Sequence, residues 1–330
     1  MHSTLTQAPC VHQDPEICRV IDSRYACLGF DAMGSRFEFL IDSAGAGLRG
    51  YDTRAIAEEL RELVLDWHQR LSIFDPTSIA SIINRTAAGS PVFLDAEMYA
   101  LCALCDQLRV RTRGAFNIAA GTLMHAHGFR DSPMTSYGVN LETLDLEHAI
   151  VLDHQRQTVL KTDDRISIDF GGIAKGFVLD LIRLELEEYG VVNAFIHGGT
   201  SSIIAIGQNH NGIPWTTGIG DGHRLALSGH AVGVSETRSQ TQARGPDSIG
   251  HVMDPTTGQP VHNSITQIVC VHSNGTAADA YSTACCVNPS LIDDLCADPC
   301  TLIAFDSSPT PIIHDPLVVV QSLGPDYDRS

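Results

Sequence analysis

The chain has 330 residues, with 21 basic and 39 acidic side chains and a formal net charge of −18. Hydrophobic residues make up 43% and charged residues 18%, which is enough apolar material for a sizeable core and too little charge for a disordered chain. The acidic excess excludes nucleic acid as the main partner, because phosphates attract Lys and Arg. At roughly 150 residues per domain, the length fits two domains or one large α/β body.

The first ten residues carry no export or membrane signal. They lack both the basic region and the apolar region of a secretory signal peptide. No apolar run in the chain approaches the roughly 18 residues that span a bilayer. We therefore expect no membrane insertion, and a protein that is cytoplasmic, or soluble with any export signal removed.

Ten cysteines are scattered along the chain. Cys102 and Cys105 form one C-x-x-C pair and Cys296 and Cys300 lie four apart, but neither pair has the partner pair that a zinc site needs. We expect them to be structural thiols of a reducing compartment, because a disulfide framework is typical of short secreted chains.

Hydrophobic periodicity predicts the elements of the first half. Alternation over residues 36–41 predicts a strand, and apolar residues at helical spacing predict helices over 53–71 and 95–112. The turn between these helices ends at Ser78, which is a suitable cap for a short helix over 79–84.

The second half alternates between strands and helices. Its longest expected element is a helix from about 174 to 189 that ends at Gly190, a frequent C-terminal signal. This pattern predicts an α+β fold with mixed sheets. The other expected elements are strands at 151–152, 165–169, 193–196, 202–206 and 267–271, and a helix at 277–287.

The segment from Asp169 to Phe177 reads Asp-Phe-Gly-Gly-Ile-Ala-Lys-Gly-Phe, so an expected strand meets two glycines and then a helix. Glycines allow a ligand to approach the backbone, and a helix start presents free N–H groups to anions. Lys175, one of only two lysines in the chain, adds a positive charge there. The pattern fits a pyrophosphate site; a tight strand-to-helix turn with a surface lysine fits it equally well.

Asp279 and Thr283 lie four residues apart on an expected helix. This spacing puts a carboxylate and a hydroxyl on one face, and both are hard oxygen ligands suited to Mg²⁺. The structural alternative is that Asp279 only stabilises the first turn of its helix.

His251 and Asp254 share a short loop with a Pro-Thr-Thr-Gly turn. A histidine there can act as general acid or base, although most of the 15 histidines will be surface or packing residues. His125 and His127 form a single H-x-H, which supplies too few ligands for a metal site.

Taken together and in order, six segments resemble the FAD:protein FMN transferase family, also called ApbE. The resemblance implies a T-fold-like α+β architecture with mixed sheets and flanking helices. It implies an N-terminal extension over 1–27, a flavin transferase domain over 28–305 and a C-terminal tail over 306–330, with a sub-division near 130–165 left open. The matching segments are residues 30–35, 71–78, 114–117, 169–177, 251–258 and 278–284.

The same resemblance implies a Mg²⁺-dependent enzyme with FAD as its substrate. Such an enzyme moves FMN from FAD onto a Thr or Ser hydroxyl of an acceptor flavoprotein subunit and releases AMP. Two alternatives stay open at this stage. One is a diphosphatase that hydrolyses FAD to FMN and AMP, and the other is a non-catalytic FAD-binding or carrier protein.

The site residues that the resemblance implies fall into three groups. His251 is the expected catalytic residue. The expected metal ligands are Asp279 and Thr283, helped by Ser282 and by the carbonyl oxygen of Ala174. The expected flavin and FAD contacts are Met33, Phe74, Ala115, Phe116, Asn117, Gly171, Lys175, Phe177 and Met253.

Several positions depart from the family's usual residues. Asn117 stands where an aspartate is usual, Thr200 follows a Gly-Gly pair that usually precedes an aspartate, and residues 232–237 match the usual Ala-Thr-Ser-Gly-Asp-Tyr loop only loosely. We expect these changes to affect acceptor recognition more than FAD or metal binding.

Overall fold

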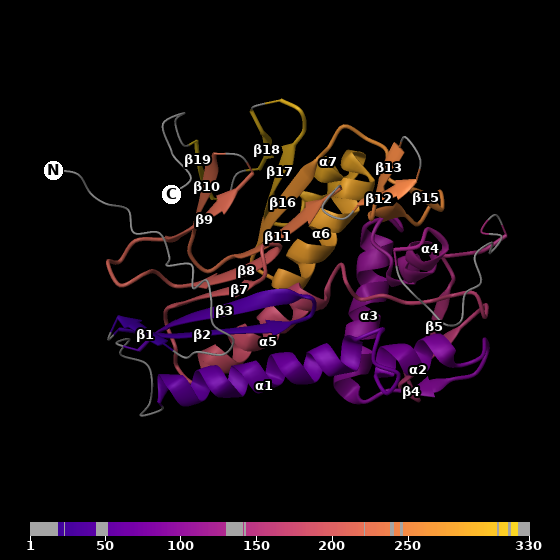
Figure 1. Ribbon diagram of the computed structural model, residues 1–330, viewed down its shortest axis with the longest axis horizontal. Coiled ribbons are helices and arrows are strands. Elements are labelled where there is room, and N and C mark those ends of the chain that lie inside the picture. The colour runs from indigo at the N-terminus through magenta and orange to yellow at the C-terminus, as the bar shows by residue number, and fades with distance from the viewer. Residues whose placement is uncertain are drawn as a thin grey trace.

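The computed structural model describes residues 19–22, 24–43, 52–129, 141, 143–220, 222–237, 241–244, 247–308, 310–315 and 318–322. Its centre is a nine-stranded sheet in the order β1-β2-β3-β7-β8-β11-β16-β17-β18 (Figure 1). The strands are β1 (Arg19–Asp22), β2 (Tyr25–Ala32), β3 (Ser35–Asp42), β7 (Ala194–Gly198), β8 (Ser202–Ile206), β11 (Ala231–Glu236), β16 (Gln267–His272), β17 (Cys300–Phe305) and β18 (Ile312–His314).

Helices cover one face of this sheet. α5 (Ala174–Glu188) lies against β7 and β8, α6 (Gly275–Val287) lies against β11 and β16, and α1 (Thr53–Leu71) runs beside α5 and β2 (Figure 1). The other helices are α2 (Ile79–Arg85), α3 (Ala96–Arg111), α4 (Gly121–Ala126) and α7 (Ile292–Leu295), with 3₁₀ turns η1 (Ile118–Ala120) and η2 (Pro289–Leu291).

Smaller sheets complete the fold. A three-stranded sheet in the order β19-β10-β9 covers the other face of the central sheet through a second apolar cluster. The remaining strands are β9 (Trp215–Ile219), β10 (His223–Leu227), β19 (Val319–Ser322), β4 (Val92–Phe93), β5 (Ile150–Asp153), β6 (Thr158–Lys161), β12 (Thr241–Arg244), β13 (Asp247–Gly250), β14 (Met253–Asp254) and β15 (Gln259–Pro260).

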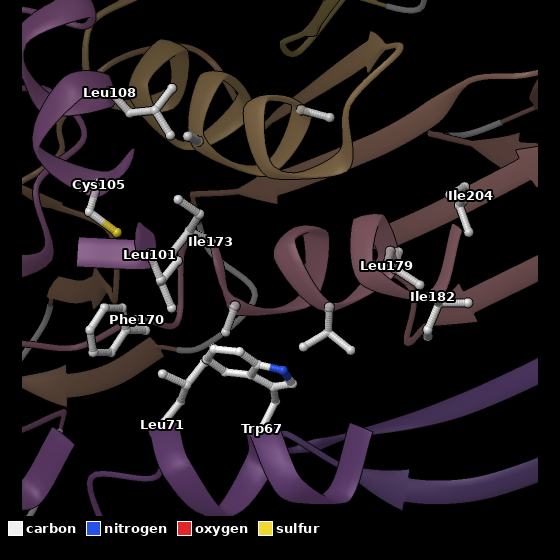
Figure 2. Packing of buried hydrophobic residues seen from close by; sticks show 14 of the residues in the cluster. Trp67, Leu71, Leu101, Cys105, Leu108, Phe170, Ile173, Leu179, Ile182 and Ile204 are labelled. Carbon is white, nitrogen blue, oxygen red and sulfur yellow. The ribbon is translucent and has the colours of Figure 1, made fainter. Parts of the chain in front are cut away.

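The central strands are buried on both faces. On β8, Ile204 belongs to the helix-side core, whereas Ile203 and Ala205 face the small sheet. Figure 2 shows the helix-side core, where Trp67 and Leu71 of α1 point toward α5 and meet residues of α3 and of the 170–173 turn. Burial of this apolar area supplies the main favourable free energy for folding.

The predicted helices are confirmed, and their caps are formed. Asp52 accepts a hydrogen bond from the Arg54 amide at the start of α1, and Ser78 accepts one from Ser81 at the start of α2. α6 begins two residues earlier than expected, because the side chain of Asn274 caps it by accepting the Ala277 amide. The α+β class is confirmed; mixed sheets were expected, but every strand pair in the described ranges is antiparallel.

The strand predicted over 165–169 is wrong. Residue 165 lies in a turn, residues 166–169 belong to no helix or strand, and side chains bind the backbone of this segment. Asn84 accepts the Ile168 amide at 2.7 Å and donates to the Ile168 carbonyl at 3.0 Å, as a neighbouring strand would. Thr122 accepts the Ser167 amide at 2.8 Å in the same way. Apolar alternation therefore marks a buried segment without specifying a ladder partner.

The expected domain limits stay predictions. The described part of the chain leaves out residues 1–18, which include Cys10 and Cys18, and also residues 130–140 and 323–330. Two strands from the expected tail, β18 and β19, pair with β17 and β10. None of the helices within the described ranges is long and apolar enough to cross a membrane.

Candidate functional site

α5 and α6 touch through glycines. A Cβ atom on Gly176 would lie 2.1 Å from the carbonyl oxygen of Gly275, so a side chain there would force the helices apart. One turn further along α5, Asp180 accepts hydrogen bonds from the amides of Gly275 (2.6 Å) and Thr276 (2.8 Å). A carboxylate at a helix N-terminus is favourable. These contacts bring the Gly171–Gly172 corner, just before α5, close to Thr283 in the second half of α6.

Asp279 is the carboxylate that this contact buries. Its side chain accepts the Gly176 amide at 2.7 Å and the Ser202 hydroxyl at 2.9 and 3.1 Å. Burial raises the pKa of Asp279 to about 7, although the charge of Lys175 and the two hydrogen bonds act in the opposite direction. No ion pair to Asp279 occurs in the part of the chain described, so a bound cation would supply the missing charge.

Three hydroxyl groups lie beside Asp279. Ser235 Oγ is 2.9 Å from Ser282 Oγ and 3.1 Å from Thr283 Oγ1, and Ser282 donates to the main-chain carbonyl of Asp279 at 2.9 Å. A Cβ atom on Gly172 would lie only 3.4 Å from Thr283 Oγ1, so the Thr283 hydroxyl faces bare backbone at the double-glycine corner.

The donor set fits Mg²⁺, which binds hard oxygen ligands and usually keeps several waters. One carboxylate (Asp279) and one hydroxyl (Thr283) stand near the start of α5, where the buried Ala174 begins the helix without a side-chain cap. Within the described ranges, no group of three or more His, Cys, Asp or Glu side chains is placed to hold a metal. A softer metal that needs such a group therefore fits less well.

The loop of residues 114–117 forms one wall of the corner. Phe116 is buried, and its ring edge would be 3.6 Å from a Cβ atom on Gly172. Asn117 caps η1 by accepting the Ala119 amide at 2.9 Å, and it donates to the Leu146 carbonyl at 2.8 Å. The Asn117 amide thus holds the loop in place from inside, whereas the Phe116 ring lies against the corner.

The tip of the β2–β3 hairpin contacts α1 and the turn after β7. Met33 adopts a φ of +50° there, and its amide donates to Nδ1 of His68 at 3.0 Å. Ser35 is packed against Gly199, where an added Cβ would lie 2.7 Å from the Ser35 Cβ. An open groove of the surface is lined by His68 and by hairpin residues between Asp31 and Arg36.

Two of the expected flavin contacts, Phe74 and Phe177, are aromatic residues near the C-terminal end of α1. Phe74 is 70% exposed in the turn after the helix, which is unusual for a large apolar side chain. Phe177 of α5 packs edge-to-face on Trp67, with ring centroids 4.8 Å apart. Phe74 thus offers an exposed ring just after α1, and Trp67 near the end of the same helix carries the half-buried ring of Phe177.

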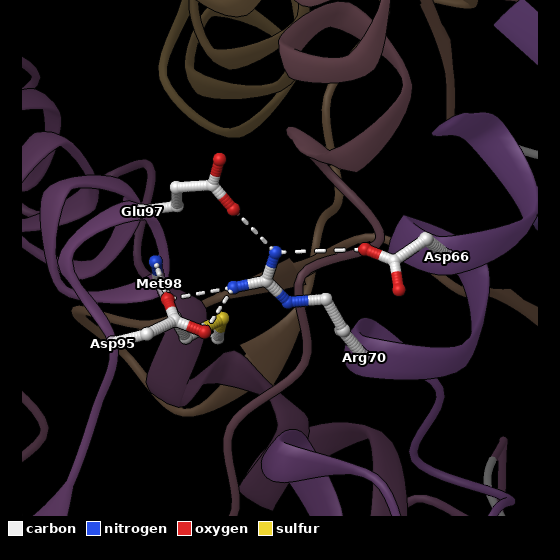
Figure 3. Close-up of polar contacts among 5 residues, drawn as sticks. All are labelled: Asp66, Arg70, Asp95, Glu97 and Met98. Atoms are coloured by element: carbon white, nitrogen blue, oxygen red, sulfur yellow. Dashed lines mark hydrogen bonds and ion pairs between the residues drawn. The ribbon is translucent and has the colours of Figure 1, made fainter. Parts of the chain in front are cut away.

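Arg70 anchors this helix end to α3. Its guanidinium lies 2.7 Å from both Asp95 and Glu97 and 3.6 Å from Asp66 (Figure 3). The same group stacks 4.0 Å from the centroid of the Trp67 ring. Arg70 thus holds Trp67 in the orientation in which it meets Phe177.

Of the remaining predicted residues, Lys175 and Gly171 lie at the corner and Met253 lies in a separate core. The Lys175 side chain is half-buried and makes no ion pair or hydrogen bond with any residue that the structure describes. The Gly171 amide is bound by Asp169 at 2.7 Å. Met253 is buried in a separate small core with Leu123, so its side chain serves packing.

His251 lies two positions before Met253 in the sequence and is half-buried. The hairpin that follows His251 meets the loop of residues 114–117, since the Thr256 methyl group is 3.6 Å from the Cβ position of Gly114. The structure thus brings the 251–256 segment against the loop that carries Phe116. Its catalytic role stays a prediction.

Two residues near the expected metal ligands were missed by sequence reasoning. Ser202 begins β8 and Ser235 lies near the end of β11, and both hydroxyls contact α6. Neither residue belongs to a local chemical pattern. Their partners lie 77 and 47 positions further along the chain, which only tertiary structure reveals.

Comparison with known proteins gives a consistent result. The model of the ApbE family matches residues 33–296. A FAD:protein FMN transferase of Rhodobacter capsulatus is 25% identical over 244 residues, which cover 70% of this chain and 45% of that protein. The FAD:protein FMN transferase of Vibrio cholerae is 23% identical over 252 residues, covering 70% of this chain and 73% of that protein. The chain thus spans less than half of the first relative.

Solved structures show the same fold. The ApbE protein of Thermotoga maritima superposes with a TM-score of 0.75 at 23% identity, covering 87% of this chain and 96% of that one. The flavin transferase ApbE of Vibrio cholerae superposes with a TM-score of 0.74 at 18% identity, covering 91% and 97%. The expected architecture is therefore confirmed.

Proposed function

The chain belongs to the ApbE family, and on that basis we propose that it is a Mg²⁺-dependent flavin transferase. It moves FMN from FAD onto a Thr or Ser hydroxyl of an acceptor protein and releases AMP. Relatives that carry the name FAD:protein FMN transferase support this reaction. In it, the acceptor oxygen forms a bond to the FMN-side phosphorus, and the bond from that phosphorus to the AMP oxygen breaks.

The observation that carries the proposal is the position of Asp279 and Thr283 beside the double-glycine corner. Gly176 binds the Asp279 carboxylate, and Gly172 faces the Thr283 hydroxyl. A diphosphate at this corner would meet the start of α5 and the charge of Lys175, which has no ion-pair partner among the residues described, and both favour anions. Oxygen ligands and an anion site thus stand next to each other, as phosphoryl transfer requires.

Asp279, Thr283 and the carbonyl of Ala174 would hold the metal. Bound there, Mg²⁺ would neutralise negative charge that develops on the phosphate oxygens. His251 would take the proton of the attacking hydroxyl. Phe74, Phe116 and Phe177 would contact the flavin, with Met33 and Ala115 beside them, because aromatic and apolar side chains suit its flat ring system.

The test is incubation of the protein with FAD and Mg²⁺, with and without peptides that contain Thr or Ser. A transferase releases AMP and leaves a fluorescent flavin on the peptide in a denaturing gel. Release of AMP with no labelled peptide in any combination would identify a FAD diphosphatase. Bound FAD that stays intact would identify a carrier protein, and the proposed reaction would then be wrong.

A further inference from the structure

The hydroxyl groups beside Asp279 form a chain whose hydrogen-bond direction is fixed at one end. The Asp279 carbonyl can only accept, so Ser282 must donate its proton to it. The oxygen of Ser282 is then left as an acceptor for Ser235, which lies 2.9 Å away. Because Ser235 donates its only hydroxyl proton to Ser282, Ser235 must accept a hydrogen bond from Thr283 at 3.1 Å.

The direction of these hydrogen bonds decides whether Thr283 presents its proton or its lone pairs to the double-glycine corner. Its proton points toward Ser235, so the lone pairs of Oγ1 are left for a ligand on the Gly172 side. A metal ligand needs lone pairs, whereas a proton pointing into the site would repel a cation. Ser282, by contrast, uses its proton and a lone pair within the chain, and it is 1% exposed.

Ser202 binds Asp279, the other expected metal ligand. Its hydroxyl lies 2.9 Å from Oδ1 and 3.1 Å from Oδ2 of Asp279, and the Gly176 amide binds Oδ2. These two donors fix the rotation of the carboxylate and occupy about half of its roughly four lone-pair positions. The remaining lone pairs are available to a cation.

From these contacts we infer that Ser202 and Ser235 are positioning residues for a metal site, Ser202 acting on Asp279 and Ser235 on Thr283. The inference rests on the proposed function. The sheet does not need either hydroxyl, because the strand pairs Ser202–Gly233 and Ser235–Ile268 are joined through backbone. Donors that orient a metal ligand typically contribute 10–100-fold to metal affinity.

The experiment compares Ser202→Ala and Ser235→Ala with the unaltered protein. Mn²⁺ alone is titrated into each protein, and free Mn²⁺ is followed by its electron paramagnetic resonance signal. Ser235→Thr keeps the hydroxyl and should rescue binding. Ser201→Ala is the matched control, because the Ser201 side chain makes no contact of this kind in the described ranges. Thermal melting without metal reports on the fold.

We expect the dissociation constant for Mn²⁺ to rise about 10-fold in each alanine variant and to stay unchanged in Ser201→Ala and Ser235→Thr. The Mg²⁺ concentration that gives half-maximal AMP release should rise by the same factor, with the rate at saturating Mg²⁺ within about twofold of the original. A purely structural role would instead lower melting temperature and rate while leaving the Mg²⁺ requirement unchanged.

Mn²⁺ binding equal to that of the unaltered protein in both alanine variants would overturn the inference. If Ser202→Ala does not fold, the half-exposed Ser235 still decides the outcome through Ser235→Ala. Failure of the proposed function looks different, because the unaltered protein itself would then leave no flavin on any peptide, whether or not it releases AMP from FAD and Mg²⁺. The Mn²⁺ comparison would still be informative in that case.

Discussion

The amide of Gly176 donates a 2.7 Å hydrogen bond to Asp279, which lies 103 positions further along the chain. This bond joins the two segments on which the proposed function depends, the double-glycine corner and the helix with the oxygen ligands. It forms only because both helices carry glycine where they touch. The proposed function requires that a metal held by α6 meets a diphosphate at the start of α5.

Asp279→Asn should abolish metal-dependent release of AMP while the protein still folds. The asparagine oxygen can accept the bonds from Gly176 and Ser202, but it brings no negative charge for a cation. We expect a loss of at least about 10²-fold in rate, measured by chromatography of AMP. Asp293→Asn, which changes a carboxylate with 90% of its side chain exposed on α7, is the control. Equal rates in the two variants would refute the assignment of Asp279.

The stability of the metal-free protein should fall as pH rises from about 3.8 to about 7. The pKa of Asp279 is raised in the folded state to about 7 from an ordinary value of 3.8, so the folded protein holds a proton that the unfolded chain has lost in this interval. Thermal melts of the original protein and of Asp279→Asn isolate this contribution. A difference between the two that does not change with pH would contradict the predicted shift.

Metal affinity should depend on pH in the opposite sense. Since the ligand must be deprotonated, Mn²⁺ binding should weaken as pH falls below about 7, by up to about tenfold per unit. Mn²⁺ titrations at several pH values, made on the folded protein, measure this dependence. Affinity that stays constant between pH 5 and pH 8 would show that the metal binds elsewhere.

Gly176→Ala should separate α5 from α6. Its Cβ would lie 2.1 Å from the Gly275 carbonyl oxygen, and a backbone atom cannot move aside as a flexible side chain can. We expect a loss of about 3 kcal/mol in the free energy of unfolding, measured by urea denaturation. Gly218→Ala is the matched control, because a Cβ there has no atom within 4 Å. Similar stability in both variants would contradict the tight contact.

Asn84→Ala should destabilise the segment before the double glycine. It leaves both the amide and the carbonyl of Ile168 without their partner, which costs about 2 kcal/mol in the free energy of unfolding. Urea denaturation checks the value, with the exposed Asn211→Ala as control. Wild-type stability in Asn84→Ala would show that the Ile168 backbone does not depend on this side chain.

Local signals predicted the helices well because the decisive contacts are local. Asp52 and Ser78 are caps that bind amides two or three residues away. Segment 165–169 shows the limit of such signals, since its partner Asn84 lies 84 positions earlier. The apolar pattern reports burial there, and it does not report what satisfies the backbone.

The same limit applies to the site. The spacing of Asp279 and Thr283 on one helix face and the glycines of the corner drew attention to these segments, and the resemblance to the ApbE family made them the expected metal and FAD sites. Ser202 and Ser235 could not be identified in this way, because a serine on a strand has no distinctive pattern until the strand is placed against α6. Asn117 was expected at the flavin wall, but both polar atoms of its side chain are engaged in holding the loop.

A crystal of the protein soaked with Mn²⁺ and FAD tests whether the metal on α6 meets the diphosphate at the start of α5. It is measured at a wavelength where manganese scatters anomalously. We predict an anomalous peak about 2.0–2.5 Å from oxygens of Asp279 and Thr283, with the FAD diphosphate beside Gly172. A manganese peak at any other place, or a diphosphate bound away from the start of α5, would contradict the account.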